Sequence, residues 1–144
     1  MNHPDAYPVK KGQTVVLRVE RLAFGGRGVA RVDGYTVFVE GALPGQEVEA
    51  LILRRKRSYA EARPVRVLVP SPHQVEPRCA DFGTCGGCAL QHLDYEAQLA
   101  AKRDQVRECL ARIAGLEDLE VEPALGSPRL YAYRNKMEFS FSPS

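Results

Sequence analysis

The sequence contains no tryptophan, only two methionines and no apolar stretch long enough to cross a bilayer. No apolar run follows the first residues, which argues against a secretory signal. A large excess of one charge is also missing, because 20 Lys and Arg stand against 18 Asp and Glu over 144 residues. We therefore expect a cytoplasmic protein with reduced thiols and no membrane partner, and the overall charge does not indicate a ligand.

The residues that are present have globular proportions, with 44% hydrophobic and 26% charged side chains. Positive charge is concentrated between residues 54 and 66, where six basic residues stand against the single acid Glu61. The six are Arg54, Arg55, Lys56, Arg57, Arg63 and Arg66. A local basic patch on a nearly neutral chain predicts a surface that docks a polyanion.

Short segments with β periodicity, separated by glycine turns, fill residues 9–70. The first alternates around Leu17 and Val19, the pattern of a half-buried strand. Asp33-Gly34 is a hairpin turn sequence between two such segments. We expect strands at residues 13–20, 28–32, 35–40, 46–53 and 59–69. Five short strands without an intervening helix predict a five-stranded barrel of the OB type.

One long helix is expected, from Asp94 to Ala114. Asp94 can cap its first turn, and Gly115 stands where a left-handed residue commonly ends a helix. Four apolar residues fall on one stripe of this helix, which predicts that the stripe packs against the rest of the protein. They are Leu99, Val106, Leu110 and Ile113.

The predicted fold class is mainly β with one long α-helix. The alternation at Met137, Phe139 and Phe141 predicts a further strand, and that strand needs a sheet to join. We therefore expect a truncated part of a longer protein. In order, the expected segments are a flexible tail at 1–8, the barrel at 9–70, a linker and cysteine loop at 71–92, the helix at 93–115 and the start of a truncated α+β central domain at 116–144.

Three cysteines share a short glycine-rich segment with the spacing C-x5-C-x2-C. They are Cys79, Cys85 and Cys88. Their thiolates can converge on one point, and the amides of Gly86 and Gly87 can donate hydrogen bonds to cluster sulfurs. Soft thiolate ligands select zinc or an iron–sulfur cluster. His92 completes a Cys3His set for zinc, so the spacing leaves both metals open.

A fourth cysteine, Cys109, lies on the predicted helix beside its apolar stripe. Its expected role is that of a small core residue, with a fourth metal ligand as the alternative. No base or helix N-terminus lies near it in the sequence, which argues against a nucleophile. No residue of the chain is assigned a catalytic role.

Basic and aromatic residues of the predicted barrel indicate a surface for RNA. The basic run at residues 54–57 is expected in a loop between two strands, where it can contact phosphates. Phe24, Arg27 and Arg31 flank a glycine turn and can offer a stacking ring and cations to single-stranded RNA. The alternative is that Phe24 packs in the core and the arginines are solvated.

Three segments resemble a known family. Residues 28–48, GVARVDGYTVFVEGALPGQEV, look like the centre of a TRAM domain, an RNA-binding barrel of RNA-modifying enzymes. Residues 79–95, which contain FGTCGGCALQHLDY, are similar to the cluster loop of SAM-dependent RNA (uracil-5-)-methyltransferases. YRNKMEF at residues 133–139 resembles the opening of their central domain, and the three matches follow the family's order.

The resemblance implies a 4Fe–4S cluster held by Cys79, Cys85 and Cys88, with a fourth cysteine ligand beyond this chain. It implies RNA, ribosomal or transfer RNA, as the partner. The family's SAM-binding domain, nucleophilic cysteine and catalytic base have no counterpart here, so S-adenosylmethionine would act only through a missing or separately encoded catalytic domain. The expected function is the RNA- and cluster-binding portion of an RNA methyltransferase, inactive alone. The alternative is a free-standing RNA-binding module with a structural Cys3His zinc site.

Overall fold

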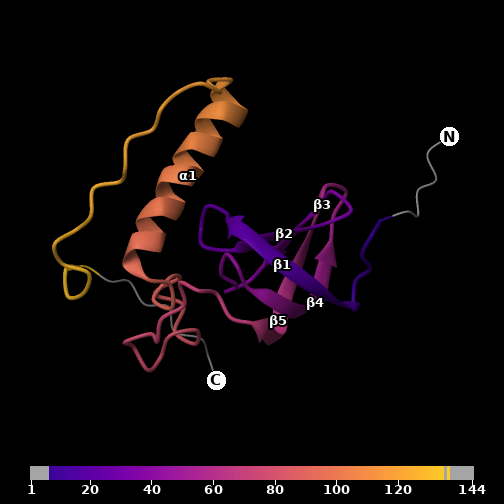
Figure 1. Cartoon of the computed structure of the whole chain (residues 1–144). Coiled ribbons are helices and arrows are strands. Elements are labelled where there is room, and N and C mark those ends of the chain that lie inside the picture. Colours follow the sequence, from indigo (N-terminus) through magenta and orange to yellow (C-terminus); the bar gives the residue numbers. More distant parts are fainter. Residues whose placement is uncertain (1–6, 135, 137–144) are drawn as a thin grey trace.

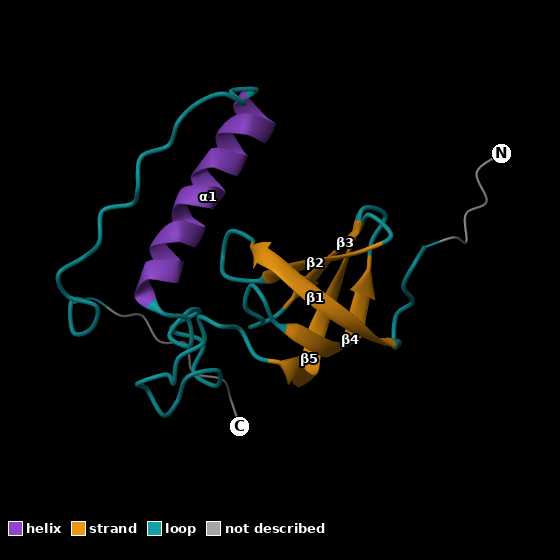
Figure 2. Cartoon of the chain, in the orientation of Figure 1, coloured by secondary structure: helices purple, strands orange, loops and turns teal. Residues whose placement is uncertain are grey.

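The structure is a computed structural model that describes residues 7–134 and residue 136 (Figure 1). The tail predicted at residues 1–8 falls largely outside the described residues, and so does the predicted strand around Met137, Phe139 and Phe141. The described chain forms a small barrel with one long helix beside it (Figure 2).

Five strands make the barrel within the described part of the chain. They are β1 (Thr14–Leu22), β2 (Gly28–Val32), β3 (Tyr35–Val39), β4 (Glu47–Arg55) and β5 (Tyr59–Val69). The sheet closes in the order β1-β2-β3-β5-β4, with β3 and β5 parallel and the other neighbours antiparallel. The predicted five-stranded OB-like barrel is confirmed, because this closure and strand count are those of the OB type.

The barrel core consists of aliphatic side chains that alternate along the strands. Leu17 on β1, Val37 on β3 and Ile52 on β4 are at most 1% exposed. On β5 the interior positions are held by Ala60 and Ala62, which are small enough for a narrow barrel. Because side chains alternate between the two faces of a strand, the neighbours of these residues point outward.

The predicted hairpin between β2 and β3 is present. The strands pair in register from Gly28 opposite Val39 to Val32 opposite Tyr35. Asp33 and Gly34 connect them with φ values of 49° and 79°. A two-residue turn with both φ positive matches the twist of a hairpin, which explains the Asp-Gly sequence.

The segment after β5 is held against the barrel. Ser71 is buried, and its hydroxyl donates to the carbonyl oxygen of Pro44 at 2.6 Å. The side-chain Nε2 of buried Gln46 donates to Gln74 Oε1 at 2.9 Å. The prolines after the barrel therefore lead into a chain that stays attached to the β3–β4 turn.

Helix α1 (Tyr95–Ala114) has the predicted caps. Asp94 Oδ1 accepts a hydrogen bond from the amide of Ala97 at 3.0 Å, which satisfies an otherwise unpaired donor of the first turn. Gly115 ends the helix with a φ of 69°, and its N–H donates to the carbonyl of Leu110.

The predicted packing of the helix is wrong. No residue of α1 is buried, and Val106 and Ile113 of the expected stripe are 50% and 83% exposed. Contact with the barrel is made instead by Ala97 and Ala101, which pack against a buried cluster of Leu22, Leu43 and Leu93. Small alanine side chains allow the first half of the helix to come close to the barrel, and the second half meets it through the polar side chains of Gln105 and Glu108. Cys109 is exposed, so its prediction as a core residue is also wrong.

Residues 116–134 contain no helix or strand and run back beside α1 (Figure 1). Arg103 donates to the carbonyl of Val121 at 2.7 Å, and the amide of Ser127 donates to the hydroxyl of Tyr95 at 2.7 Å. Among the described residues, no helix has the length and apolar content that a membrane span requires.

Candidate nucleic-acid interface and cysteine loop

The outer face of the barrel across β3, β5 and β4 carries one continuous row of side chains. Phe38 pairs with Glu61, and Glu61 pairs with Arg54. Phe38 and Glu61 alternate with interior residues, so both point away from the core. We call the surface formed by Arg27, Phe38, Arg54, Tyr59 and Glu61 the outer barrel face.

An aromatic pair occupies the centre of the outer barrel face. The rings of Phe38 and Tyr59 meet edge to face, with centroids 5.4 Å apart and planes at 72°. The guanidinium of Arg27 lies over the Phe38 ring, 5.7 Å from its centroid. A half-exposed aromatic pair beside an arginine offers ring surfaces and a cation to nucleobases. Sequence analysis missed Phe38 and Tyr59, although their outward position followed from the alternation with Val37 and Ala60.

The arginines of this face are exposed and paired with carboxylates. Arg27 Nη1 lies 3.4 Å from Glu61 Oε1, and Arg54 Nη1 lies 3.9 Å from Glu61 Oε2. On the adjoining strands, Arg31 Nε lies 3.7 Å from Glu20 Oε2. Each pair is partly exposed and thus contributes little to stability. The structure therefore brings Arg27 against the aromatic pair and Arg54 beside the shared Glu61, both in positions that solvent can reach, and it places Arg31 on an adjoining strand.

Phe24 lies in the β1–β2 loop and is 89% exposed. The alternative that this ring packs in the core is therefore wrong. An exposed phenylalanine leaves its apolar ring in water, and an RNA base stacked on that ring would cover it. The role of Phe24 in RNA binding stays a prediction.

The basic run does not lie in one loop. Arg54 and Arg55 end β4, and only Lys56 and Arg57 belong to the turn before β5. The guanidinium of Arg55 stacks over the ring of Tyr7, 4.1 Å from its centroid, at one end of the barrel. Arg54, Lys56 and Arg57 are exposed and can reach a polyanion.

Tyr35 supports this end of the barrel. Its hydroxyl donates to the carbonyl of Lys56 at 2.6 Å, and its ring lies 5.9 Å from that of Tyr7. Burial raises the pKa of the Tyr35 hydroxyl, because the phenolate would be poorly solvated there. The turn that carries Lys56 is therefore fixed by a hydrogen bond from the barrel.

The cysteine loop is a series of tight turns with all three thiols exposed. The amide of Phe82 donates to the carbonyl of Cys79, and the amide of Cys85 donates to the carbonyl of Asp81. A Cβ added to Gly87 would lie 3.2 Å from the sulfur of Cys85, so the missing side chain lets this sulfur lie against the backbone. Free thiols in such a loop fit a soft metal by their chemistry. Among the described residues, however, no three metal-binding side chains are gathered as a ligand set.

Two barrel turns hold the cysteine loop. His92 Nε2 donates to the carbonyl of Gly41 at 2.8 Å, in the β3–β4 turn. Gly26 of the β1–β2 loop lies against Ala89, directly after Cys88, where a Cβ added to Gly26 would be 3.1 Å from the Cβ of Ala89. The second contact joins the cysteine loop to the loop that carries Phe24.

His92 is arranged as a metal-binding histidine would be, although no thiol in the described part of the chain completes a ligand set with it. Since a carbonyl only accepts, Nε2 carries the proton and Nδ1 keeps a free lone pair. Nδ1 is buried and has no hydrogen-bond partner within the described chain. Metal-binding histidines commonly donate their other N–H to a carbonyl in this way. The ring also packs against Phe82, with centroids 4.8 Å apart.

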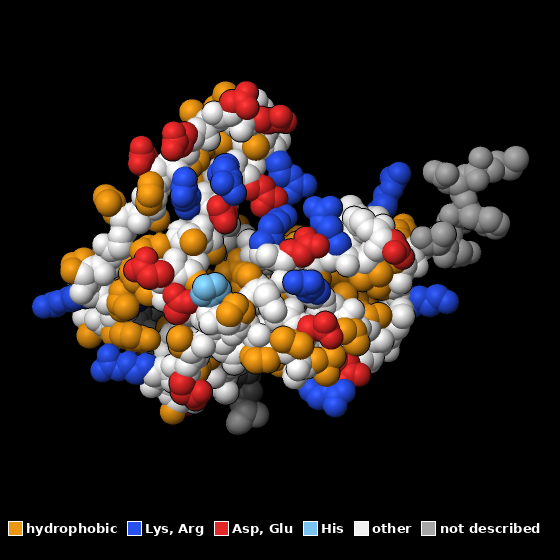
Figure 3. Space-filling view, viewed as in Figure 1, with side chains coloured by type: hydrophobic (Ala, Val, Ile, Leu, Met, Phe, Trp, Pro, Cys, Tyr) orange, Lys and Arg blue, Asp and Glu red, His pale blue; other side chains and the backbone are white. Residues whose placement is uncertain are grey.

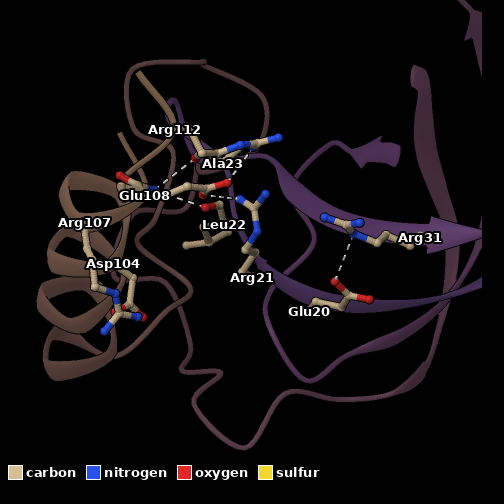
Figure 4. A network of polar contacts seen from close by, with 10 residues as sticks. Glu20, Arg21, Leu22, Ala23, Arg31, Asp104, Arg107, Glu108 and Arg112 are labelled. Atoms are coloured by element: carbon tan, nitrogen blue, oxygen red, sulfur yellow. Dashed lines mark hydrogen bonds and ion pairs between the residues drawn. The ribbon is translucent and has the colours of Figure 1, made fainter. Parts of the chain in front are cut away.

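A network of polar contacts fixes α1 against the end of β1 (Figure 4). Arg21 Nη1 lies 2.8 Å from Glu108 Oε2, and Gln105 Nε2 donates to the carbonyl of Ala23 at 3.1 Å. Acidic and basic side chains stand next to one another where α1 faces β1 (Figure 3). A groove of about 750 Å³ lies here, lined by alanines of α1 and by both charge types. Its position indicates a structural junction that holds the start of the β1–β2 loop.

Residues 8–65 match the TRAM domain family. An uncharacterized RNA methyltransferase of Bacillus cereus is 42% identical over 131 residues, which are 91% of this chain and 28% of that protein. An uncharacterized RNA methyltransferase of Listeria innocua is 44% identical over 134 residues, which are 93% of this chain and 29% of that protein.

A solved structure, that of Pyrococcus abyssi tRNA (uracil-54, C5)-methyltransferase in complex with S-adenosyl-L-homocysteine, is 28% identical, with a TM-score of 0.44. The match covers 66% of this chain and 21% of that one. The chain spans less than a third of the length of the curated relatives, at 28% and 29%. The barrel is therefore a TRAM domain, and the chain is a relative of proteins named RNA methyltransferases over at least 91% of its length.

Proposed function

We propose that this chain is the RNA-holding, cluster-bearing N-terminal part of an RNA (uracil-5-)-methyltransferase. The observation that carries the proposal is the outer barrel face, where Phe38 and Tyr59 lie beside exposed Arg27 and Arg54. OB-type barrels bind nucleic acid with their second and third strands and with the β1–β2 and β4–β5 loops. In this barrel, those elements carry Phe38, Phe24 and the second half of the basic run, Lys56 and Arg57.

In this proposal, Cys79, Cys85 and Cys88 would hold a 4Fe–4S cluster, with a fourth ligand from elsewhere. The cluster would supply a rigid brace between the barrel and the next domain. The contacts of Gly26 and His92 would keep that brace against the two barrel turns. S-adenosylmethionine would bind a catalytic domain outside this chain and methylate ribosomal or transfer RNA in the cytoplasm.

A second candidate function is an RNA-binding module with a structural zinc. The observation that favours it is the buried lone pair of His92 Nδ1, since the opposite nitrogen is already fixed by Gly41. Cys79, Cys85, Cys88 and His92 would then hold the metal. The two candidates share the RNA-binding face and differ in the metal.

Fluorescence anisotropy with a labelled single-stranded RNA tests the shared claim. Phe24→Ala is expected to weaken binding at least about fivefold, because a stacked base contributes about 1–3 kcal/mol. Arg54→Ala is expected to weaken binding about three- to tenfold, since a phosphate contact contributes somewhat less. Arg66→Ala is the matched control, since Arg66 is paired with Glu49 between β4 and β5, away from the aromatic pair. Equal losses in all three variants would contradict binding by the outer barrel face and the β1–β2 loop.

A further inference from the structure

Glu61 lies in the middle of the surface that we propose for RNA. Its side chain is 28% exposed, whereas its partners Arg27 and Arg54 are 53% and 73% exposed. Each carboxylate oxygen faces one guanidinium, at 3.4 Å and 3.9 Å. The acid therefore lies under two arginines that can reach solvent.

The position of Glu61 has two possible physical consequences. A carboxylate can hold guanidiniums in place for a ligand, or it can compete with the ligand for them. Holding requires short, well-aligned pairs, such as a bidentate contact. The two pairs here are long, single and partly exposed, and such pairs fix a side chain weakly. Competition is therefore the stronger effect, because the full negative charge of Glu61 stays close to any phosphate bound at Arg27 or Arg54.

Arg31 repeats the arrangement on the neighbouring strands, where it faces Glu20 at 3.7 Å. Arg27 is also shared between Glu61 and the Phe38 ring. When a phosphate replaces Glu61 as the partner of Arg27, the guanidinium can stay over the Phe38 ring. The exchange therefore needs only a movement of the guanidinium, without a change in the barrel.

We propose that Glu61 sets the RNA affinity of the outer barrel face, as an internal counter-ion that RNA phosphates must displace from Arg27 and Arg54. The inference rests on the proposed RNA binding. It assigns to Glu61 a role opposite to that of its neighbours on the same face, since removing its charge strengthens binding. The ligand group is the phosphodiester of single-stranded RNA.

The test compares Glu61→Gln with the unchanged 144-residue chain in anisotropy titrations from about 50 to about 200 mM salt. Glutamine keeps the shape and removes the charge. At the low salt, the variant is expected to bind RNA about three- to fivefold more tightly, the effect of one nearby exposed charge. The slope of the logarithm of the binding constant against the logarithm of the salt concentration is expected to become steeper by up to about 0.7. This is the change that one more phosphate contact causes on a single strand.

Glu49→Gln is the matched control, because it makes the same charge change and releases Arg66 from a 3.2 Å pair on β4 and β5. It is expected to change affinity by less than about twofold, since a remote exposed charge is largely screened. Equal tightening in both variants would overturn the proposal by showing a general charge effect. Unchanged or weaker binding by Glu61→Gln would also overturn it, and weaker binding would assign Glu61 a holding role.

Arg54→Ala separates this inference from the proposed function. If Arg54→Ala weakens binding and Glu61→Gln fails to strengthen it, only the role of Glu61 is wrong. If Arg54→Ala has no effect, or the unchanged chain binds no RNA at low salt, both the proposed RNA-binding face and the proposed role of Glu61 are wrong. Circular dichroism of each variant checks that the barrel is folded.

Discussion

His92 Nε2 donates a hydrogen bond to the carbonyl oxygen of Gly41, 51 positions earlier in the chain and 2.8 Å away. This bond joins the cysteine loop to the turn between β3 and β4. It also fixes the tautomer of the ring, which leaves the buried Nδ1 as an acceptor. One side chain thus takes part in holding the loop and, under the zinc alternative, in binding the metal.

Under the proposed iron–sulfur function, His92→Ala is expected to loosen the loop and to retain iron and acid-labile sulfide. The variant loses one hydrogen bond and the packing against Phe82, which together contribute about 1–2 kcal/mol to the free energy of unfolding. Metal analysis of the purified variant separates the two candidate functions. Loss of bound zinc on this substitution would instead support the Cys3His module.

Cys85→Ser is expected to abolish stoichiometric metal binding, because the loop would lose one of its three thiolates. Cys109→Ser makes the same chemical change at an exposed position of α1 and is expected to retain the metal. Anaerobic purification followed by analysis of iron, acid-labile sulfide and zinc measures both. Retention in Cys85→Ser, or loss in Cys109→Ser, would refute the proposed ligand set.

Gly26→Ala is expected to destabilise the protein by more than Gly25→Ala does. Both glycines have a φ near +90°, at 87° and 89°, so an alanine costs about 1–2 kcal/mol of backbone strain at either position. Only at Gly26 would the new Cβ meet a neighbour, the Cβ of Ala89 at 3.1 Å, whereas nothing lies within 4 Å at Gly25. Chemical denaturation measures the difference. Equal losses would mean that the two loops do not depend on this contact.

Tyr35→Phe is expected to reduce the loss of stability at alkaline pH. Burial raises the folded-state pKa of Tyr35 above its unfolded value. The protonated hydroxyl therefore stabilises the fold fully below about pH 10, and this stabilisation is lost as the pH rises through the folded-state pKa. At neutral pH the variant lacks the hydrogen bond to Lys56 and loses about 1 kcal/mol. Thermal unfolding as a function of pH measures both effects, with Tyr59→Phe as the control that keeps Tyr35. An unchanged alkaline profile in Tyr35→Phe would refute the assignment.

Local rules predicted much of the barrel from the sequence. Strand β5 begins and ends at the predicted residues, Tyr59 and Val69, and the Asp33-Gly34 turn forms the predicted hairpin. The helix caps at Asp94 and Gly115 also follow from residue type. Each of these features depends on neighbours in the chain, for which periodicity and turn preferences are informative.

Features that depend on tertiary packing were predicted poorly. The apolar stripe of α1 was expected to be buried, yet the helix meets the barrel through Ala97 and Ala101. An apolar stripe predicts that a helix has a covered face, but the sequence alone does not say which residues fit against Leu22 and its neighbours. The Phe38–Tyr59 pair was missed because β3 and β5 are distant in sequence and become neighbours only when the barrel closes.

Ultraviolet crosslinking of a 4-thiouridine-containing single-stranded RNA to the chain, with the attached peptides identified by mass spectrometry, tests the central claim most directly. We predict crosslinks in the peptides that contain Phe24, Phe38 or Tyr59, because these rings lie at the β1–β2 loop and on the outer barrel face. Crosslinks confined to α1 and residues 116–134 would contradict RNA binding by the barrel.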